Sequence, residues 1–589
     1  MKPLPPGAHG DAHGTTFVAW STRAREVAVR LFDDRGAVTR TEPLVATGGG
    51  RFERHLDAVR PGDLYKLVLD GEELPDPYAR FLPLGVHGPA RVVEQGREPM
   101  SALPDAPPPW QWVLYELHVG TFSPEGTYRG ARARLDAIAE LGFTAIELMP
   151  VAAFPGERGW GYDAVALYAP HAPYGGPEDL RALVRAAHER GLAVVLDVVY
   201  NHLGPSGNYL STYAPEYFTS EITTPWGTAP DFAYEPMRRL VVDNARYWLE
   251  EFGLDGLRLD ATHAIVDTSS RHVLREITDE AHAMQPPRRI FFEDERNDPS
   301  VVQDLGADAI WADDFHHQLH VLSTHERDGY YGAYDPSVAA LARAVTEGWT
   351  FTGQPYEPWN GRPRGASARD HGLTPENLVF CIQNHDQVGN RALGTRLSHE
   401  IGIDAYCAAS VLLLFLPATP LVFMGQEWAS SSPFLFFSDH EGALGEAVRE
   451  GRREEFRTFA AFADPKARDR IPDPQSKSTF DRSKLRWDER TEDPHARVLA
   501  TYRAMLRLRR NDPVLSARAS WGDLETTAHG KVLEVVRRAG SSRRRLIVSF
   551  DDQDFHVTAG VGRSRVLFSS GRFEEGALAP RGAVVLAED

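Results

Sequence analysis

From residue 111 onward, the sequence alternates short apolar runs with amphipathic segments of helical period. This alternation predicts an α/β fold of parallel strands joined by helices, and eight strand candidates are what a (β/α)8 barrel requires. An open doubly wound sheet is the alternative, but no glycine-rich dinucleotide fingerprint follows the first run. The apolar runs are 113–119, 143–150, 193–202, 256–260, 290–293, 309–315, 378–386 and 421–427, and the helical segments are 130–141, 177–190, 236–252 and 271–284.

The segments on either side of this pattern have a different character. Residues 1–95 alternate β-rich runs with Gly, Pro and Asp turns and predict an N-terminal β-sandwich of the carbohydrate-binding-module kind. Residues 96–110 are rich in proline and aperiodic, which is typical of a linker. The barrel is then expected over 111–516, and a C-terminal all-β domain over 517–589. A chain of 589 residues is long enough for three such domains.

The end of the barrel contains an apolar run, 405–424, that is long enough to be mistaken for a membrane span. Pro417 and Pro420 divide it, so we expect a buried helix to about Leu416 and a buried strand over 421–424 instead. A further helix is predicted within 493–510, with Asp493 as its N-cap and Pro494 at its first position.

Charge and cysteine usage exclude several classes of partner. The net charge of −19 repels phosphate backbones and argues against nucleic acid. The two cysteines form no metal-binding spacing, so neither a disulfide framework nor a zinc site is expected. The first residues lack the continuous apolar segment of a secretory signal, which favours a cytoplasmic location without membrane attachment. The sequence gives no indication of an oligomeric state.

Polar motifs follow four of the predicted strands, at 197–202, 258–263, 292–294 and 384–386. In a (β/α)8 barrel the carboxyl ends of the strands face one pocket, so we expect these side chains to converge there. Alternation along 256–260 directs Arg258 and Asp260 to the face opposite the neighbouring leucines.

Two of these carboxyl groups, Asp260 and Glu293, fit the hydrolysis of a glycosidic bond. That reaction needs an ionised carboxylate as nucleophile and a protonated carboxylic acid for the leaving group. Arg258 is expected to hold Asp260 ionised, and the apolar residues before Glu293 to raise its pKa. Glu295 is the competing acid, although the loop signal that begins at residue 296 favours Glu293.

Other residues around the pocket have both a functional and a structural interpretation. Asp386 is suited to binding sugar hydroxyls, and His202 and His385 to donating hydrogen bonds to them. Trp160 and Tyr162 lie in a polar, glycine-rich segment and are either a sugar-stacking platform or core aromatic residues. A single Asp at a strand end is more often a helix cap than a catalyst, and Arg258 with Asp260 can be a structural ion pair.

Together, the four motifs resemble the conserved regions of the α-amylase clan of retaining glycoside hydrolases. The resemblance implies that Asp260 is the nucleophile, Glu293 the acid/base and Asp386 the transition-state stabiliser. It also implies that Tyr162, His202, Arg258 and His385 surround the glucose unit on the non-reducing side of the cleaved bond.

Within that clan, segments 74–93, 115–128, 311–317, 381–397 and 423–456 resemble the maltooligosyltrehalose trehalohydrolase family. The resemblance implies hydrolysis of the α-1,4 bond next to the terminal trehalose of maltooligosyl trehalose, in the cytoplasm and without a cofactor. Asn201 stands where many clan members bind calcium, but this family does not generally depend on the ion, so no metal is expected. The candidates for trehalose selection are Asp294, Asp314, Phe315 and Trp428.

Two other functions compete with this interpretation. A glycogen-branching enzyme would use the same carboxylates but transfer the glycosyl group to a sugar, and segments 311–317 and 426–434 resemble the trehalohydrolases instead. A non-catalytic glucan-binding homologue would be free to lose the three carboxylates, which this chain retains.

Overall fold

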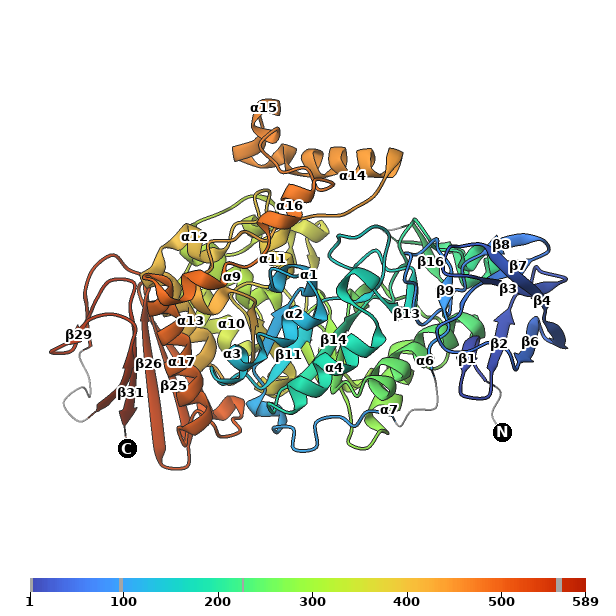
Figure 1. Ribbon diagram of the computed structural model, residues 1–589. Coiled ribbons are helices and arrows are strands. Elements are labelled where there is room, and N and C mark those ends of the chain that lie inside the picture. Colours follow the sequence, from blue (N-terminus) through green and yellow to red (C-terminus); the bar gives the residue numbers. More distant parts are fainter. Residues whose placement is uncertain (1–3, 95–98, 225–226, 558–563, 589) are drawn as a thin grey trace.

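The computed structural model describes residues 4–94, 99–224, 227–557 and 564–588, and it has three regions in a row (Figure 1). A β-rich N-terminal region lies at one end, a barrel with surrounding helices in the middle, and a C-terminal β region at the other end (Figure 1). Part of the predicted linker, residues 95–98, lies outside the described residues.

The central region is a closed parallel barrel, which confirms the predicted fold class and rules out the open sheet. The first strand pairs with both the second and the last, and this closes the sheet. Each of the eight predicted runs contributes one strand. In barrel order, the strands are β10 (Leu114–Leu117), β11 (Ala145–Leu148), β14 (Ala193–Val198), β17 (Gly256–Leu259), β18 (Arg289–Glu293), β19 (Ala309–Trp311), β22 (Leu378–Cys381) and β23 (Thr419–Phe423).

Apolar residues on both faces of the strands hold the barrel together. Those facing inward, among them Leu114, Val195 and Leu421, form a cluster of their own, while those facing outward pack under the helices. Burial on both faces is the reason that the strands read as nearly continuous apolar runs. The surrounding helices include α2 (Tyr128–Arg132), α3 (Leu135–Ala139), α4 (Pro177–His188), α6 (Glu235–Glu251), α7 (Val273–His282), α9 (Asp313–Thr324), α13 (Ile403–Phe415) and α17 (His495–Asn511).

Three local predictions were wrong. The helix expected over 130–141 is divided into α2 and α3. Helix α17 begins at His495, because Pro494 takes the cap position and its carbonyl accepts a hydrogen bond from the Val498 N–H. The last barrel strand begins at Thr419 and contains Pro420, which is tolerated near the start of a strand.

The N-terminal region is a sandwich of two antiparallel sheets. Its core is continuous with barrel residues such as Val165 and Tyr213, and the Tyr213 hydroxyl donates to the Pro75 carbonyl at 2.8 Å. The sandwich is therefore packed directly on the barrel. One sheet contains β1 (Gly7–Gly10), β2 (Thr15–Trp20), β6 (Arg51–Leu56) and β5 (Val45–Gly48); the other contains β4 (Val38–Pro43), β3 (Val27–Phe32), β7 (Leu64–Leu69) and β8 (Glu72–Leu74), and β9 (Ala90–Arg91) pairs with β7.

The C-terminal region is all-β, as predicted, and a buried arginine fastens it to the barrel. Arg537 donates to the Phe415 carbonyl at the end of α13 at 2.9 Å. Its larger sheet contains β24 (Leu524–His529), β25 (Val532–Ala539), β26 (Ser542–Ser549), β31 (Ala583–Glu588) and β28 (Arg565–Ser569), and its smaller sheet contains β27 (Phe555–His556), β30 (Ala577–Leu578) and β29 (Phe573–Glu574).

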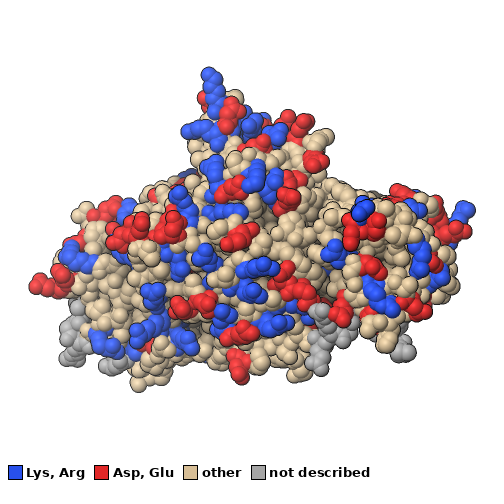
Figure 2. Space-filling view, in the orientation of Figure 1, with Lys and Arg blue, Asp and Glu red and all other residues tan. Residues whose placement is uncertain are grey.

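Two further features bear on partners. Within the described parts of the chain, no helix has both the length and the apolar character needed to span a membrane. The face in Figure 2 shows basic and acidic side chains interspersed rather than a continuous basic surface.

Helices α14 (Gly442–Glu455) and α15 (Pro465–Arg468) project from the body of the molecule (Figure 1).

Candidate active site

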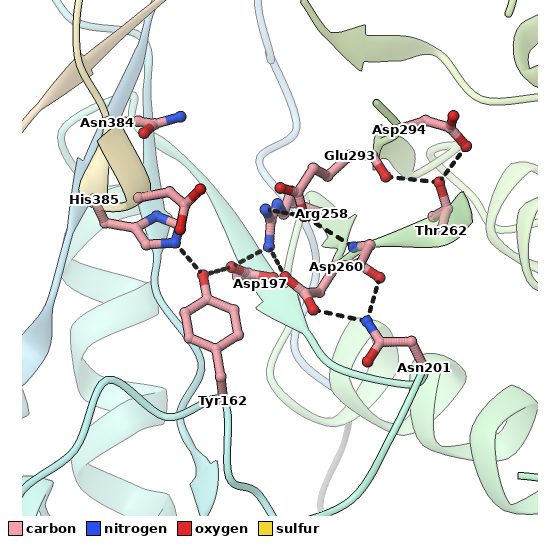
Figure 3. Close-up of polar contacts among 12 residues, drawn as sticks. Tyr162, Asp197, Asn201, Arg258, Asp260, Thr262, Glu293, Asp294, Asn384 and His385 are labelled. Carbon is pink, nitrogen blue, oxygen red and sulfur yellow. Dashed lines mark hydrogen bonds and ion pairs between the residues drawn. The ribbon is translucent and has the colours of Figure 1, made fainter. Parts of the chain in front are cut away.

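The polar side chains that follow four barrel strands meet at the mouth of the barrel, as the sequence predicts (Figure 3). Asp197 is the last residue but one of β14, Arg258 is the last residue but one of β17 with Asp260 just beyond that strand, and Glu293 ends β18. His385 lies just beyond β22, in the short helix α11 (His385–Gly389).

The buried guanidinium of Arg258 is the centre of this network. Its Nη1 lies 2.7 Å from Asp197 Oδ2 and 2.9 Å from Asp260 Oδ1, and its Nη2 lies 2.7 Å from Glu293 Oε2. The group also lies 4.3 Å from the centre of the Trp311 ring, which adds a cation–π contact. One cation therefore holds three carboxyl groups from three strands.

Asp260 is held by two kinds of donor. Besides Arg258, the Asn201 amide donates to Asp260 Oδ2 at 2.7 Å and to the Asp260 carbonyl at 2.8 Å. Burial raises the pKa of Asp260, and the charge of Arg258 opposes that increase. The sequence led us to expect that Arg258 serves Asp260 in particular; in the structure Glu293 shares the same cation.

Glu293 accepts a second hydrogen bond, from the backbone N–H of Ala261 at 2.9 Å. Ala261 has φ 40° and ψ 53°, a left-handed conformation that is strained for a residue with a Cβ and that occurs often at functional sites. Burial and the nearby charge of Asp260 raise the pKa of Glu293. Glu295 lies beyond the end of β18 with a side chain 53% exposed, 3.8 Å from His263.

His385 and Tyr162 form the opposite wall of the site. The Tyr162 hydroxyl donates to Asp197 Oδ2 at 2.5 Å and lies 2.8 Å from His385 Nε2, and the two rings stack at 22°. Burial alone would lower the pKa of His385, but the Glu116 carboxylate raises it to about 9. Asp386 is half-buried next to His385, accepts from Asn390 at 2.6 Å, and has a pKa raised by burial.

His202 faces the same network from the end of the third strand. Burial lowers its pKa to about 4, so its imidazole is neutral at neutral pH. Its Nδ1 is hydrogen-bonded to the amide oxygen of Asn201. That oxygen is the atom that a calcium ion would take from Asn201, and the amide nitrogen donates to Asp260, so both ends of the Asn201 side chain already take part in the network around Asp260.

Three of the residues proposed for trehalose selection are fully buried, and the structure does not place them on the pocket. The Asp314 carboxylate is occupied by five donors, including the Tyr334 hydroxyl at 2.5 Å and Arg364 at 3.0 Å. Phe315 stacks on Phe380 in the core at 4.5 Å, and Trp428 packs against Trp487 at 5.1 Å.

Asp294 and Trp160 are also more enclosed than the sequence suggests. Asp294, the remaining candidate for trehalose selection, accepts from Thr262 at 3.0 Å and from Arg296 at 2.6 Å. Trp160 is 6% exposed, stacks on Phe434 and meets the His385 ring edge-on at 5.8 Å. It therefore supports His385 from behind and does not offer an open stacking face.

Two acidic residues that sequence reasoning missed belong to the site. Asp313, the first residue of α9, is half-buried, and burial together with the charges of Glu293 and Asp386 raises its pKa to about 8. The signal available in the sequence was that Asp313 follows Trp311, the last residue of the barrel strand β19, by only two positions. Glu116, in the first strand, binds His385.

A cavity of about 460 Å³ begins beside Asp386 and is lined by Tyr330, Gln387, Arg391 and Phe459, among others.

The barrel, the appended sandwich and the carboxyl groups at its mouth define an α-amylase-type glycoside hydrolase. Residues 94–221 match the family model of the α-amylase catalytic domain, and residues 5–79 match carbohydrate-binding module 48, the isoamylase N-terminal domain. A solved structure of a Salmonella typhimurium protein, described as a candidate α-amylase, superposes with a TM-score of 0.90 over 100% of both chains at 39% identity.

The chain belongs to the malto-oligosyltrehalose trehalohydrolase family. It is 49% identical to the malto-oligosyltrehalose trehalohydrolase of Deinococcus radiodurans, over 95% of this chain and 90% of that protein. It is 39% identical to the trehalohydrolase of Saccharolobus solfataricus, over 85% of this chain and 86% of that protein.

Proposed function

We propose that this enzyme hydrolyses the α-1,4-glucosidic bond next to the terminal trehalose of maltooligosyl trehalose, and that it releases trehalose and a maltooligosaccharide. The identity to trehalohydrolases along nearly the whole chain supports this choice of substrate. The cytoplasmic location implied by the resemblance is part of the same proposal and is tested by cell fractionation.

The observation that carries the mechanism is the shared guanidinium of Arg258. Its two terminal nitrogens bind Asp260 and Glu293, so the two carboxyl groups lie close together. Retaining glycosidases hold their two carboxyl groups ~5 Å apart, whereas inverting enzymes separate them further to admit water. The arrangement therefore supports a retaining reaction.

In the first step, the Asp260 carboxylate attacks the anomeric carbon of the glucose unit. The bond to the trehalose oxygen breaks, and Glu293 transfers its proton to that oxygen. In the second step, water attacks the same carbon, Glu293 accepts the water proton, and the ester bond to Asp260 breaks. The maltooligosaccharide leaves with retained configuration and both carboxyl groups return to their initial states.

The remaining side chains of the pocket have supporting roles in this proposal. Asp386 binds hydroxyls of the glucose unit and stabilises its distorted ring, and the His385 and Tyr162 rings form the wall beside that unit. The single hydrogen of the neutral His202 imidazole goes to the Asn201 amide oxygen, so His202 orients the Asn201 amide toward Asp260. Arg258 and Asn201 favour the ionised form of Asp260. Burial and the charge of Asp260 favour the protonated form of Glu293, and the charge of Arg258 opposes it.

Product analysis tests this function. We expect rapid release of trehalose from maltotriosyl trehalose, little cleavage of maltopentaose, and an α-configured sugar as the first product in NMR spectra. New α-1,6 branches would replace the proposal with a branching enzyme. Binding of either sugar without any product would replace it with a glucan-binding protein.

A further inference from the structure

Glu116 contacts the catalytic pocket from below, through His385. It lies on the first barrel strand and is 1% exposed. Its Oε2 accepts the backbone N–H of His385 at 3.0 Å, and its Oε1 is bonded to His385 Nδ1. A carboxylate of β10 therefore fixes both the backbone and the ring of a residue that follows β22.

The hydrogen bonds around His385 determine where its protons are. Asp197 Oδ2 accepts from Tyr162 at 2.5 Å, so the single hydroxyl hydrogen of Tyr162 is committed to that carboxylate. Arg258 donates to the same oxygen of Asp197 at 2.7 Å, which favours the ionised form. His385 Nε2, 2.8 Å from the Tyr162 oxygen, must then be the donor in that contact.

The other ring nitrogen is also a donor, because Nδ1 faces the acceptor-only carboxylate of Glu116. With a hydrogen on both nitrogens, the ring is an imidazolium. Nearby charges act in both directions: Glu116 and Asp386 favour this cation, and Arg258 opposes it. The other titratable groups that face His385 are Glu147, Asp197, Glu293, Tyr162 and His118.

We propose that Glu116 is a positioning residue: it keeps His385 protonated and turned so that Nε2 donates to the Tyr162 oxygen, which holds the wall formed by Tyr162 and His385 in place beside the glucose unit that Asp260 attacks. The proposal rests on the proposed function for the identity of that sugar. Glu116 touches neither sugar nor reacting atoms, and it acts only through His385.

The neighbouring strand offers a matched control. Glu147 is the register partner of Glu116 on β11 and is equally buried. Among the described residues, neither of its carboxyl oxygens has a hydrogen-bond partner. Burial and the charge of Glu116 raise its pKa well above the usual range, which favours its uncharged form. Glu147→Gln therefore changes a buried carboxyl group next to Glu116 without removing a hydrogen bond to His385.

The direct test measures the chemical shifts of the His385 imidazole by NMR as a function of pH, in the full-length protein labelled with isotope-enriched histidine. The signal is assigned by its absence in His385→Gln. We expect a titration midpoint near 9 in the native chain, since burial is outweighed by Glu116. Glu116→Gln should lower that midpoint by about one pH unit or more, and Glu147→Gln should leave it in place.

Kinetics supply a second readout. A maltotriosyl fluoride needs no proton for its leaving group, so the alkaline limb of kcat/KM in its hydrolysis is expected to follow His385 rather than Glu293. Glu116→Gln should shift this alkaline limb to lower pH and reduce kcat/KM by about 10²-fold. In the His385→Gln background the same substitution should have little further effect, because both act through one group.

Several results would overturn the proposal. These are a midpoint for the native chain at or below the ordinary value of about 6.5, an unchanged midpoint in Glu116→Gln, or an equal change in Glu147→Gln. The midpoint of the native chain decides the matter even if Glu116→Gln does not fold. Because the titration needs no substrate, its outcome is independent of whether the proposed reaction is correct.

Discussion

The guanidinium of Arg258 binds the carboxyl group of Glu293 at 2.7 Å, although the two residues lie on different strands of the barrel. The same group binds Asp260 at 2.9 Å. A single cation therefore sets the separation of the two proposed catalytic carboxyl groups and moderates the increase in their pKa values that burial causes.

Replacing Arg258 with lysine tests this arrangement. A lysine keeps the charge but offers a single nitrogen, which cannot bind three carboxyl groups in the planar geometry of a guanidinium. We expect kcat/KM for maltotriosyl trehalose to fall by about 10²-fold or more. Arg296→Lys is the control, because Arg296 binds Asp294 and not the pair. A near-native rate in Arg258→Lys would contradict the assigned role.

Glu293→Gln should lower kcat/KM by about 10²–10⁴-fold, because an amide cannot supply the proton that the leaving trehalose needs. Only the protonated acid is active in the first step, so the native enzyme should lose activity as pH rises through the raised pKa of Glu293. Glu295→Gln, two residues away on the exposed loop, should leave both the rate and the pH profile intact. The reverse pattern would assign the acid to Glu295.

Asp313 and Asp314 are adjacent, yet their substitutions should change stability in opposite directions. The unfolded chain releases the Asp313 proton near pH 4, whereas the folded chain retains it to about pH 8, so this residue destabilises the fold progressively across that window. Relative to the native chain, Asp313→Asn should therefore gain stability as pH rises from 4 to 8, by at most ~1.4 kcal/mol per pH unit.

Asp314→Asn should instead destabilise the protein by about 3–5 kcal/mol, since it leaves the buried Arg364 without its charged partner. Thermal unfolding of both variants, measured at a fixed scan rate from pH 4 to pH 8, checks both signs. A pH-independent difference between Asp313→Asn and the native chain would show that Asp313 does not titrate as described.

Gly389→Ala should disturb the support of His385. A Cβ at this position would lie 2.1 Å from Cζ2 of Trp160, whose ring packs against the His385 ring. We expect a loss of about 1–3 kcal/mol in the free energy of unfolding and a reduced kcat. Gly451→Ala, in helix α14 with nothing within 4 Å of the added Cβ, should instead stabilise by about 0.5–1 kcal/mol. Equal unfolding temperatures for the two variants would argue against the contact.

The sequence by itself determined the barrel and the polar motifs at its mouth. A strand buried on both faces must be apolar along most of its length, so eight such runs were recognisable without any tertiary information. Alternation along a strand also determines which side chains share a face, and this was sufficient to place Arg258 and Asp260 at the mouth.

Only the tertiary structure decided which other acids join them. Asp313 and Asp314 are indistinguishable in sequence, but a helix starts at Asp313 and turns successive side chains by about 100°. The first carboxyl group therefore faces Glu293, while the second is buried among donors from distant loops. The contact between Glu116 and His385 joins residues 269 positions apart, and the closure of the barrel brings them together through a pairing that no local pattern encodes.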